Sequence, residues 1–473
     1  MSNRREFLSS AACLMGAVAM SPAANAMNRL PEPAKRRHKS ADDNSMVGFV
    51  APRLQKIRVG VVGVGGRGTS AVYRLASVPG VEVTALCELV ESKAVNAQQQ
   101  LKERGFAAPQ LFIGPEAYKR MCESGLCDAV HINTNWVSHA EIALFAIRSG
   151  LHTFVEVPGC RTIDESWEIV EATEKHRVHC MILSNCCYGE DEMLMINLSR
   201  LRILGELYHA EGCYLHETRE RQGQAFLGPD KIFSSLETLI DHTGMCYPTH
   251  ALGPVALAMD INRGDRFDYL VSMGSKGFAW QEYAIQKYGP DAPVSKIKFE
   301  ANDFNTTLIR TANGKTIMLR QCNNSPMPYT RVHSLYGFNG TVSTNPLTAG
   351  VEPSLGAGVG RWLKDEALNE FRAKYGHQLW REAGEIARRV GGHGGMDYLM
   401  DLRWSYCLRH GLPLDMTVYD LATWSCVFPL SEQSVRKHSV PLDIPDFTRG
   451  SWKTNPRVGD MTIDMEKAFG NKG

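Results

Sequence analysis

The sequence lacks a charge bias and, beyond its first residues, any long apolar run. Its 52 lysines and arginines nearly balance 51 aspartates and glutamates, for a net charge of +1. Such a chain has no strong field to attract nucleic acid or an acidic membrane surface. No apolar stretch outside the N-terminus is long enough to span a bilayer. We therefore expect no nucleic-acid partner, and no membrane insertion once the N-terminus has been removed.

Metal-binding cysteine patterns are also missing. The chain has 13 cysteines, but Cys122 and Cys127 are not spaced as a Cys-x-x-Cys pair, and no zinc arrangement is visible. Several others, such as Cys87, Cys180 and Cys213, fall inside apolar strand patterns. We expect most of them to be small buried residues and expect no metal site.

The first 26 residues have the pattern of a twin-arginine signal peptide. Arg4-Arg5 precedes a weakly apolar stretch from Leu8 to Met20, and Ala24-Asn25-Ala26 offers small residues for cleavage. Lipidation at Cys13 is the alternative. We expect export to the periplasm or beyond. Residues 27–55, with several prolines and a basic cluster, are expected to form a linker or surface arm, with order beginning at Ile57.

Short apolar strands alternate with helical patterns from about residue 56 to 185. Ile57 to Val62 and Val81 to Leu86 are two such strands, each followed by a helix. This alternation predicts a Rossmann domain with a doubly wound parallel sheet.

Residues 186–473 have a different pattern, in which strand-like segments follow each other closely. Asn313-Gly314 and Asn339-Gly340 stand between alternating runs and indicate hairpins. The overall fold class is therefore α/β, with a Rossmann domain followed by an α+β domain that has a largely antiparallel open sheet. No internal repeat is present.

A glycine-rich turn indicates a dinucleotide site. Gly63, Gly65 and Gly68 form G-x-G-x-x-G, with Gly66 and Arg67 between them, after a strand and at the start of a helix. The glycines allow close approach of a pyrophosphate, and the helix N-terminus supplies N–H groups. Without that context the motif would indicate only a tight turn without a ligand.

The second strand ends in an acid, which bears on the choice of dinucleotide. Glu88 follows Gly63 by about 25 residues and is placed to accept hydrogen bonds from a ribose diol. Its charge would repel a 2′-phosphate, so the expected cofactor is NAD. Arg67 leaves NADP open, since an arginine could bind that phosphate.

Three short segments resemble the glucose–fructose oxidoreductase, inositol dehydrogenase and MocA (Gfo/Idh/MocA) superfamily. They are Thr134 to His139, Gly150-Leu151-His152 and Glu156-Val157-Pro158. The resemblance runs in order over roughly residues 56–345 and implies the same two-domain fold. In most of these dehydrogenases a lysine replaces Val157 and moves the proton of the substrate hydroxyl. Valine cannot do this, so ordinary alcohol dehydrogenation is in question.

One branch of the superfamily, glycoside hydrolase family 109, lacks this lysine. The segments Ser184 to Met193, Tyr247 to Ala256, Pro328-Tyr329 and Gly392 to Leu399 are similar to its motifs. The resemblance implies a glycosidase that holds NAD tightly and acts on glycosides, N-acetylgalactosaminides among them. An arginine that contacts substrate in this family is missing between Ser234 and Cys246, so the sugar specificity does not carry over.

The resemblance implies a redox route to hydrolysis. NAD takes hydride from C3 of the sugar, the acidified C2 proton is removed, the C1 substituent leaves, water adds, and the hydride returns. No pair of catalytic carboxylates is needed. Two alternatives remain: an NAD-dependent sugar oxidoreductase with net hydride transfer, and a non-catalytic binder.

The motifs also imply roles for individual residues. We expect His250 to transfer the proton of the C3 hydroxyl, with Tyr247 beside it, and Tyr214 to contact the substrate. Tyr329 is the candidate base for C2, which requires the site to lower its pKa from about 10. Tyr188 is the alternative. For His250 and Tyr329 the competing interpretation is simple packing.

The remaining predictions concern the cofactor and the assembly of subunits. Glu156 is expected at the nicotinamide ribose, and the rest of the cofactor wall comprises Val157, Asn185, Trp136 and His139. His139 is better explained as a residue that orients a turn. His393 and Asp397 are expected to cap a helix, with a role near the sugar as the lesser alternative. Because open sheets in this superfamily commonly pack between subunits, we expect a homodimer.

Overall fold

The computed structural model describes residues 45–227, 236–322, 324, 326–351 and 360–470. The expected signal peptide and most of the expected linker lie outside these ranges. Residues 45–55 are ordered against the C-terminal helices: Met46 and Ala51 are buried, and the Leu54 amide donates to the Leu408 carbonyl at 3.1 Å. Order therefore begins before Ile57, because this stretch has a surface to pack on.

The first sheet has six parallel strands in the order β3-β2-β1-β4-β5-β6. They are β1 (Ile57–Val62), β2 (Val81–Glu88), β3 (Gln110–Ile113), β4 (Ala129–Ile132), β5 (His152–Val155) and β6 (Cys180–Ile182). The strand order reverses between β1 and β4, which is where doubly wound sheets bind ligands at the strands' carboxyl ends. The predicted Rossmann sheet is confirmed.

Helices connect these strands and carry several site residues at their N-termini. They are α1 (Gly66–Ala76), α2 (Glu91–Glu103), α3 (Ala117–Glu123), η2 (Trp136–Ser138), α4 (His139–Arg148) and α5 (Ile163–His176). A capping box at Thr162 and Glu165 begins α5. After β6 the chain turns through η3 (Asn185–Tyr188) into α6 (Glu190–Arg200).

The second sheet has eight strands in the order β13-β12-β11-β7-β10-β9-β8-β14. They are β7 (Leu207–Leu215), β8 (Phe267–Gly274), β9 (Phe304–Thr311), β10 (Thr316–Cys322), β11 (His333–Gly337), β12 (Gly340–Ser343), β13 (Thr348–Val351) and β14 (Leu442–Asp443). Every neighbouring pair is antiparallel except β7 with β10. The largely antiparallel sheet is confirmed.

Both predicted hairpins form. Asn313-Gly314 lies between β9 and β10, and Gly314 has a φ of 85° that suits glycine. In the second hairpin Gly337 pairs with Gly340, so the two-residue loop is Phe338-Asn339 and lies one residue earlier than the Asn-Gly pair suggested.

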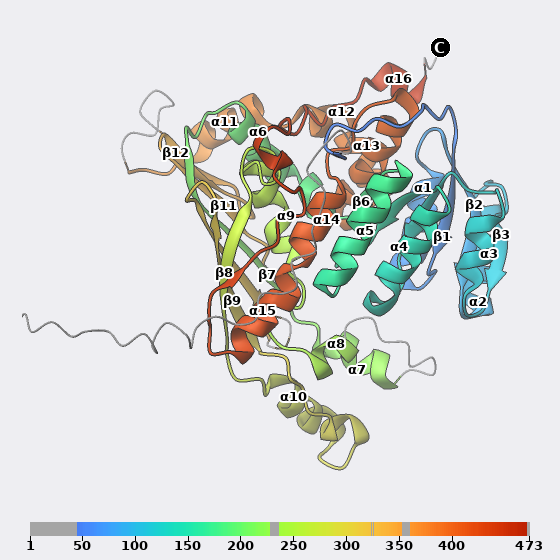
Figure 1. The fold of residues 1–473 in the computed structure, drawn as a ribbon, viewed down its shortest axis with the longest axis horizontal. Helices are drawn as coiled ribbons and strands as arrows, with labels where there is room; N and C mark the ends of the chain where they lie inside the picture. The colour runs from blue at the N-terminus through green and yellow to red at the C-terminus, as the bar shows by residue number, and fades with distance from the viewer. Residues whose placement is uncertain (1–44, 228–235, 323, 325, 352–359, 471–473) are drawn as a thin grey trace, which may run out of the picture. The chain divides into compact units, whose positions relative to one another are not determined.

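The other helices are distributed over both sheets. They are α7 (Arg219–Leu227), α8 (Leu236–Asp241), α9 (Thr249–Ala258), α10 (Ala279–Tyr288), η4 (Pro293–Lys296), α11 (Asp365–Tyr375), α12 (Gln378–Val390), η6 (His393–Gly395), α13 (Met396–His410), α14 (Val418–Ser425), α15 (Val427–Arg436), η7 (Ser451–Lys453) and α16 (Met465–Phe469). Helix α9 packs on β7, while α13 contacts α1 and α14 contacts α5 (Figure 1). The C-terminal segment thus returns to the Rossmann sheet and contributes to its site.

The described cysteines are all buried, as their apolar surroundings in the sequence suggested. Over the described ranges no helix is both long and apolar enough to cross a membrane.

Candidate active site

A cavity of about 1100 Å³ runs along the carboxyl edge of the Rossmann sheet. One end is lined by Gly63 and Glu88, and the other by Tyr214, Tyr247 and His250 of the second domain. The cavity therefore joins the predicted cofactor residues to the predicted sugar residues.

The glycine turn leaves space at the N-terminus of α1. Gly63 has a φ of 83°, and a side chain there would meet the Asn133 backbone at 2.8 Å. A Cβ on Gly68 would lie 1.8 Å from the Gly63 carbonyl, so this helix packs too closely on β1 for any side chain. Gly65 and Gly66 face open space in the cavity. This is the shape that a pyrophosphate needs.

Glu88 is held at the cavity wall by backbone donors. Its carboxylate accepts the N–H groups of Val64 at 2.6 Å, Leu89 at 2.8 Å and Val90 at 3.1 Å. A carboxylate has about four acceptor sites, so it keeps capacity for a ribose hydroxyl. Its position fits NAD and disfavours a 2′-phosphate.

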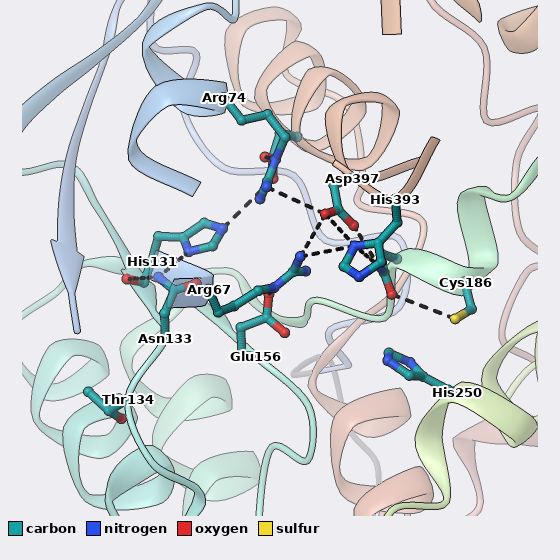
Figure 2. Close-up of polar contacts among 12 residues, drawn as sticks. Arg67, Arg74, His131, Asn133, Thr134, Glu156, Cys186, His250, His393 and Asp397 are labelled. Carbon is teal, nitrogen blue, oxygen red and sulfur yellow. Dashed lines mark hydrogen bonds and ion pairs between the residues drawn. The ribbon is translucent and has the colours of Figure 1, made fainter. Parts of the chain in front are cut away.

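Arg67 points toward Glu156 and Asp397, which also line the cavity (Figure 2). Its Nε lies 2.6 Å from the Glu156 carboxylate, and its Nη1 lies 2.6 Å from that of Asp397. The side chain is thus engaged away from Glu88. The NADP alternative that rested on Arg67 therefore loses its support.

The charge of Arg67 also bears on the missing lysine. Burial disfavours the cation, but Glu156 and Asp397 outweigh burial and raise the pKa of Arg67 above its usual value. The cation beside Glu156 can therefore orient groups but cannot exchange protons. Val157 is buried and lines the cavity without a polar atom. Acid–base chemistry must come from residues at the sugar end.

Asp397 is the centre of this charge cluster. Besides Arg67, it accepts from Asn185 Nδ2 at 2.5 Å and contacts His393 Nδ1 at 2.9 Å. Burial opposes its ionisation, but His393, Arg67 and Arg74 outweigh burial and hold the pKa of Asp397 well below its usual value. The expectation that Asp397 and His393 cap a helix is wrong, because the N-cap of α13 is Gly395 and no side chain caps it. Asp397 and His393 instead fix the cofactor loop to the C-terminal segment.

A second layer of charge lies behind this cluster. Arg74 pairs with Asp401 and lies 3.5 Å from Asp397, and His131 lies 3.8 Å from Asp401. This layer could not be predicted from the sequence, because its members come from α1, β4 and α13 and follow no motif.

His139 has a structural position. Its Nδ1 faces the Pro158 carbonyl at 2.7 Å and its Nε2 faces the Thr134 carbonyl at 3.1 Å. Both ring nitrogens are thereby occupied, and the ring is fully buried. It orients the turn after β5, as the simpler interpretation held.

The predicted sugar residues come together as an aromatic wall. The Trp136 ring stacks on Tyr247 with centroids 5.1 Å apart and planes at 16°. Tyr214 lies 5.1 Å from His250 and 5.9 Å from Tyr329, measured between ring centroids. Stacked aromatic faces of this kind suit the apolar faces of a sugar ring.

His250 and Tyr247 form a hydrogen-bonded pair. The Tyr247 hydroxyl lies 3.1 Å from His250 Nε2. Burial, reinforced by the charges of Arg331 and Arg67, lowers the pKa of His250 well below its usual value. The imidazole is therefore neutral near pH 7 and able to accept a proton. Burial raises the pKa of Tyr247 well above 10, so its hydroxyl stays protonated.

Tyr329 is not among the residues that line the cavity; its ring packs against that of Tyr214, which does line it, and about half of the Tyr329 surface is exposed. Its hydroxyl accepts a hydrogen bond from Arg331 Nη1 at 3.1 Å. Burial raises the pKa of Tyr329, and the charge of Arg331 acts in the opposite direction without overcoming it. The expected lowering of this pKa is therefore wrong for the protein without ligands.

Tyr188 does not reach the cavity, which corrects its prediction as the alternative base. Its side chain is fully buried, and its hydroxyl donates to Asp415 at 2.9 Å. The position next to Asn185 is misleading, because η3 turns successive side chains in different directions. Asn185 faces Asp397, whereas Tyr188 packs into the core.

Among the cavity residues that the sequence analysis missed are Thr218, Arg221 and Gln222. They follow β7, which also carries Tyr214, so the proximity to a predicted substrate residue was an available signal. In the described part of the chain, no group of three or more histidine, cysteine, aspartate or glutamate side chains is arranged to hold a metal ion.

Two family models cover most of the described chain. Residues 57–184 match the oxidoreductase family with an NAD-binding Rossmann fold. Residues 188–454 match the C-terminal domain of glycosyl hydrolase 109.

Curated relatives match over nearly their whole length. An α-N-acetylgalactosaminidase of Bacteroides fragilis is 40% identical over 88% of this chain and 97% of its own. A glycosyl hydrolase family 109 protein of Shewanella sp. strain ANA-3 is 38% identical over 97% of this chain and 98% of its own.

Solved structures share the fold at low identity. A levoglucosan dehydrogenase in complex with NADH and levoglucosan aligns with a TM-score of 0.62 at 18% identity, covering 83% of this chain and 100% of that chain. A scyllo-inositol dehydrogenase from Lactobacillus casei with bound NAD(H) and scyllo-inositol aligns at 0.57 and 12%, covering 82% and 99%. The chain itself is an NAD-binding member of glycosyl hydrolase family 109.

Proposed function

We propose that the protein is an exported glycosidase that hydrolyses N-acetylgalactosaminides by a redox–elimination route. The substrate is suggested by the name of the Bacteroides fragilis relative. The route is supported by the position of the cofactor cavity, which continues directly into the aromatic wall of Trp136, Tyr214 and Tyr247.

When bound, NAD supplies a reversible hydride acceptor for C3 of the sugar and is not consumed. The residues Gly65, Gly66 and Glu88 would hold its pyrophosphate and ribose. At the sugar, neutral His250 accepts the proton of the C3 hydroxyl, with Tyr247 donating to or accepting from its Nε2. The Tyr329 phenolate, formed by loss of its proton to solvent, removes the C2 proton of the 3-keto sugar, the C–H electron pair forms the enolate, and the C1 substituent leaves. Water then adds at C1.

The observation that carries this proposal is the engagement of both carboxylates near the sugar end. Glu156 and Asp397 each pair with Arg67 at 2.6 Å. An ordinary glycosidase needs one carboxyl group as an acid and a second as a base or nucleophile. Here both carboxyl groups pair with one arginine, whereas the groups left for proton transfer are His250 and two tyrosines.

An aryl α-N-acetylgalactosaminide assayed without added NAD tests the proposal. We expect release of the aryl group by the purified protein, and incorporation of solvent deuterium at C2 of the product in heavy water. Cleavage without C2 exchange would contradict elimination. An unrelated aryl glucoside, and aryl galactosaminides of the opposite anomer, serve as specificity controls.

Net sugar oxidation is the second candidate, because the fold is shared with sugar dehydrogenases. Since Arg67 cannot take a proton, such an enzyme would also depend on His250. Free sugar that raises the absorbance of reduced nicotinamide, without any aryl release, would favour this candidate.

Export and assembly complete the proposal. Export is supported by the Arg4-Arg5 segment, and a Lys-Lys substitution there should retain the protein in the cytoplasm.

A homodimer is supported by the exposed Tyr269, Met273 and Leu308 on β8 and β9. Light scattering of the purified protein, with Leu308→Lys as the disrupting variant, tests the dimer.

A further inference from the structure

A second buried carboxylate lies beneath the sugar end of the cavity. Glu192, on the first turn of α6, is almost completely buried. Its Oε1 is contacted by Arg331 Nε at 3.1 Å, by His333 Nδ1 at 3.2 Å and by Asn345 Nδ2 at 2.7 Å. Burial disfavours its charge, but His333 and Arg331 outweigh burial and lower the pKa of Glu192 to about 2.

The local sequence makes room for this carboxylate. A Cβ on Gly189 would lie 2.0 Å from Glu192 Oε2, so only glycine fits at the N-cap of α6. An acidic residue in the first turn is also favoured by the helix dipole. The Asn-Cys-Cys-Tyr-Gly segment is thus explained in part as the support of Glu192.

From Glu192, one branch leads to Tyr329. Arg331 is held by Glu192 through Nε, and its Nη1 lies 3.1 Å from the Tyr329 hydroxyl and 3.6 Å from Cys186 Sγ. Arg331 is mostly buried, whereas about half of the Tyr329 surface is exposed. The guanidinium therefore presents a fixed positive charge to the phenol oxygen.

The other branch leads to His250. His333 contacts Glu192 through Nδ1, and its Nε2 lies 2.8 Å from the backbone carbonyl of His250. This contact fixes the first turn of α9, from which the His250 imidazole projects. One carboxylate thus supports both residues that are assigned proton transfers.

We propose that Arg331 is a positioning residue that holds the Tyr329 hydroxyl and stabilises its deprotonated form, and that Glu192 fixes Arg331 and, through His333, the turn that carries His250. This rests on the proposed function, since it concerns the same C2 proton. In that step Tyr329 has first lost its own proton to solvent, its phenolate oxygen takes the proton from C2, and the C–H electron pair moves into the enolate of the 3-keto sugar. Arg331 keeps its own protons throughout.

Other groups around Tyr329 set the background for a pH test. Cys186 and Glu192 disfavour a phenolate, whereas Arg331 favours it. Tyr214 and His216 pack against the Tyr329 ring with centroids 5.9 and 5.1 Å away. Arg331 is the cation in hydrogen-bond contact with the hydroxyl, so its removal should have the largest effect.

The test compares pH–rate profiles for cleavage of an aryl α-N-acetylgalactosaminide by wild type, Arg331→Met and Arg331→Lys. We expect Arg331→Met to lower the activity at neutral pH about 10-fold or more. The variant should also move the rising limb of the pH–rate profile about 1 pH unit or more to higher pH. Arg331→Lys keeps the positive charge, so it should show a smaller loss of activity and a smaller shift of the pH–rate profile than Arg331→Met. The control is Arg388→Met, whose arginine forms an exposed pair with Glu190.

A second comparison keeps the test valid if one variant folds poorly. In a Tyr329→Phe background, Arg331→Lys should change neither the profile nor the residual rate, because the hydroxyl that Arg331 contacts is gone and the positive charge that also acts on His250 is kept. Glu192→Gln should lower turnover while NAD stays bound. Unchanged profiles in both Arg331 variants would overturn the inference. A wild type that does not cleave the glycoside would instead overturn the proposed function.

Discussion

The two ends of the cavity are built in different ways. The cofactor end uses residues that lie within one strand–turn–helix–strand unit, such as Gly63, Gly68 and Glu88. The sugar end combines η2, β7, α9 and the segment before β11, and it rests on two buried charge clusters. The first end binds by backbone shape, whereas the second depends on charges that would be unstable if left unpaired.

Each charge cluster has a different use. In the first cluster, Arg67 contacts the Glu156 carboxylate through Nε and the Asp397 carboxylate through Nη1. In the second cluster, Arg331 donates a hydrogen bond from Nε to Glu192 and another from Nη1 to the Tyr329 hydroxyl. The first cluster therefore joins parts of the chain, and the second also contacts the hydroxyl of Tyr329, which packs beside the cavity residue Tyr214. The following predictions separate these uses.

Loss of the His250 imidazole should have the largest effect. We expect His250→Ala to reduce turnover by about 10²–10⁴-fold, because a proton acceptor at C3 is lost. NAD content, measured after denaturation of the purified protein, should stay near that of wild type, since the glycine turn is untouched. Tyr247→Phe, which removes only the hydroxyl partner, should give a smaller loss. A His250→Ala protein with wild-type turnover would contradict the role.

Breaking the first cluster should lower the free energy of unfolding more than breaking any exposed ion pair. Asp397→Ala leaves Arg67 and Arg74 without their shared partner, and we expect a loss of about 3–5 kcal/mol in the free energy of unfolding. Denaturant unfolding measures it. The matched control is Glu190→Ala, whose exposed pair with Arg388 should contribute only about 0–1 kcal/mol. Equal losses in the two variants would show that burial of the cluster is irrelevant.

The cofactor end could be predicted from the sequence more fully than the charge clusters at the sugar end. The parallel sheet, the glycine turn and both hairpins follow from local patterns, because alternation and turn residues act over a few positions. Arg67 and Asp397 are 330 residues apart, and Arg331 and Glu192 are 139 apart. No local pattern connects such partners, so these clusters could not be predicted. Tyr188 was misplaced because a motif gives proximity in sequence but not the direction of a side chain.

Two glycines in one turn should respond differently to alanine. Gly68→Ala places a Cβ 1.8 Å from the Gly63 carbonyl, and the overpacking should cost about 1–3 kcal/mol in stability and disturb NAD binding. Gly65→Ala meets no protein atom within 4 Å and has a φ of −74° that alanine adopts easily. It should keep its thermal stability without NAD but bind NAD less tightly, since the methyl group enters the phosphate space. After NAD removal, thermal unfolding measures the stability of each variant and calorimetric titration measures its affinity for NAD. Equal stability and equal affinity in the two variants would argue against the assignment of this space to the phosphates.

The smallest predicted effect concerns acid, at the end of the Rossmann sheet away from the cofactor. The His179 amide donates to His152 Nδ1 at 3.0 Å, at the starts of β5 and β6. Burial lowers the pKa of His152 to about 4, although Asp128 acts against it, and burial lowers that of His179 to about 3, helped by the charges of His152 and Arg177.

The unfolded chain therefore binds protons below about pH 6.5 that the folded chain does not bind. The stability that depends on neutral rings is fully present above pH 6.5 and is lost progressively as the pH falls toward 4. Between pH 6.5 and 5 the loss should be on the order of 1–2 kcal/mol for each histidine. Because ordinary carboxylates titrate near pH 4, this window isolates histidines. His152→Gln with His179→Gln should reduce the slope of unfolding free energy against pH, while the pH dependence of glycoside cleavage, set at the sugar end, stays as in wild type. A slope equal to that of wild type would mean that these two rings are not buried in their neutral form.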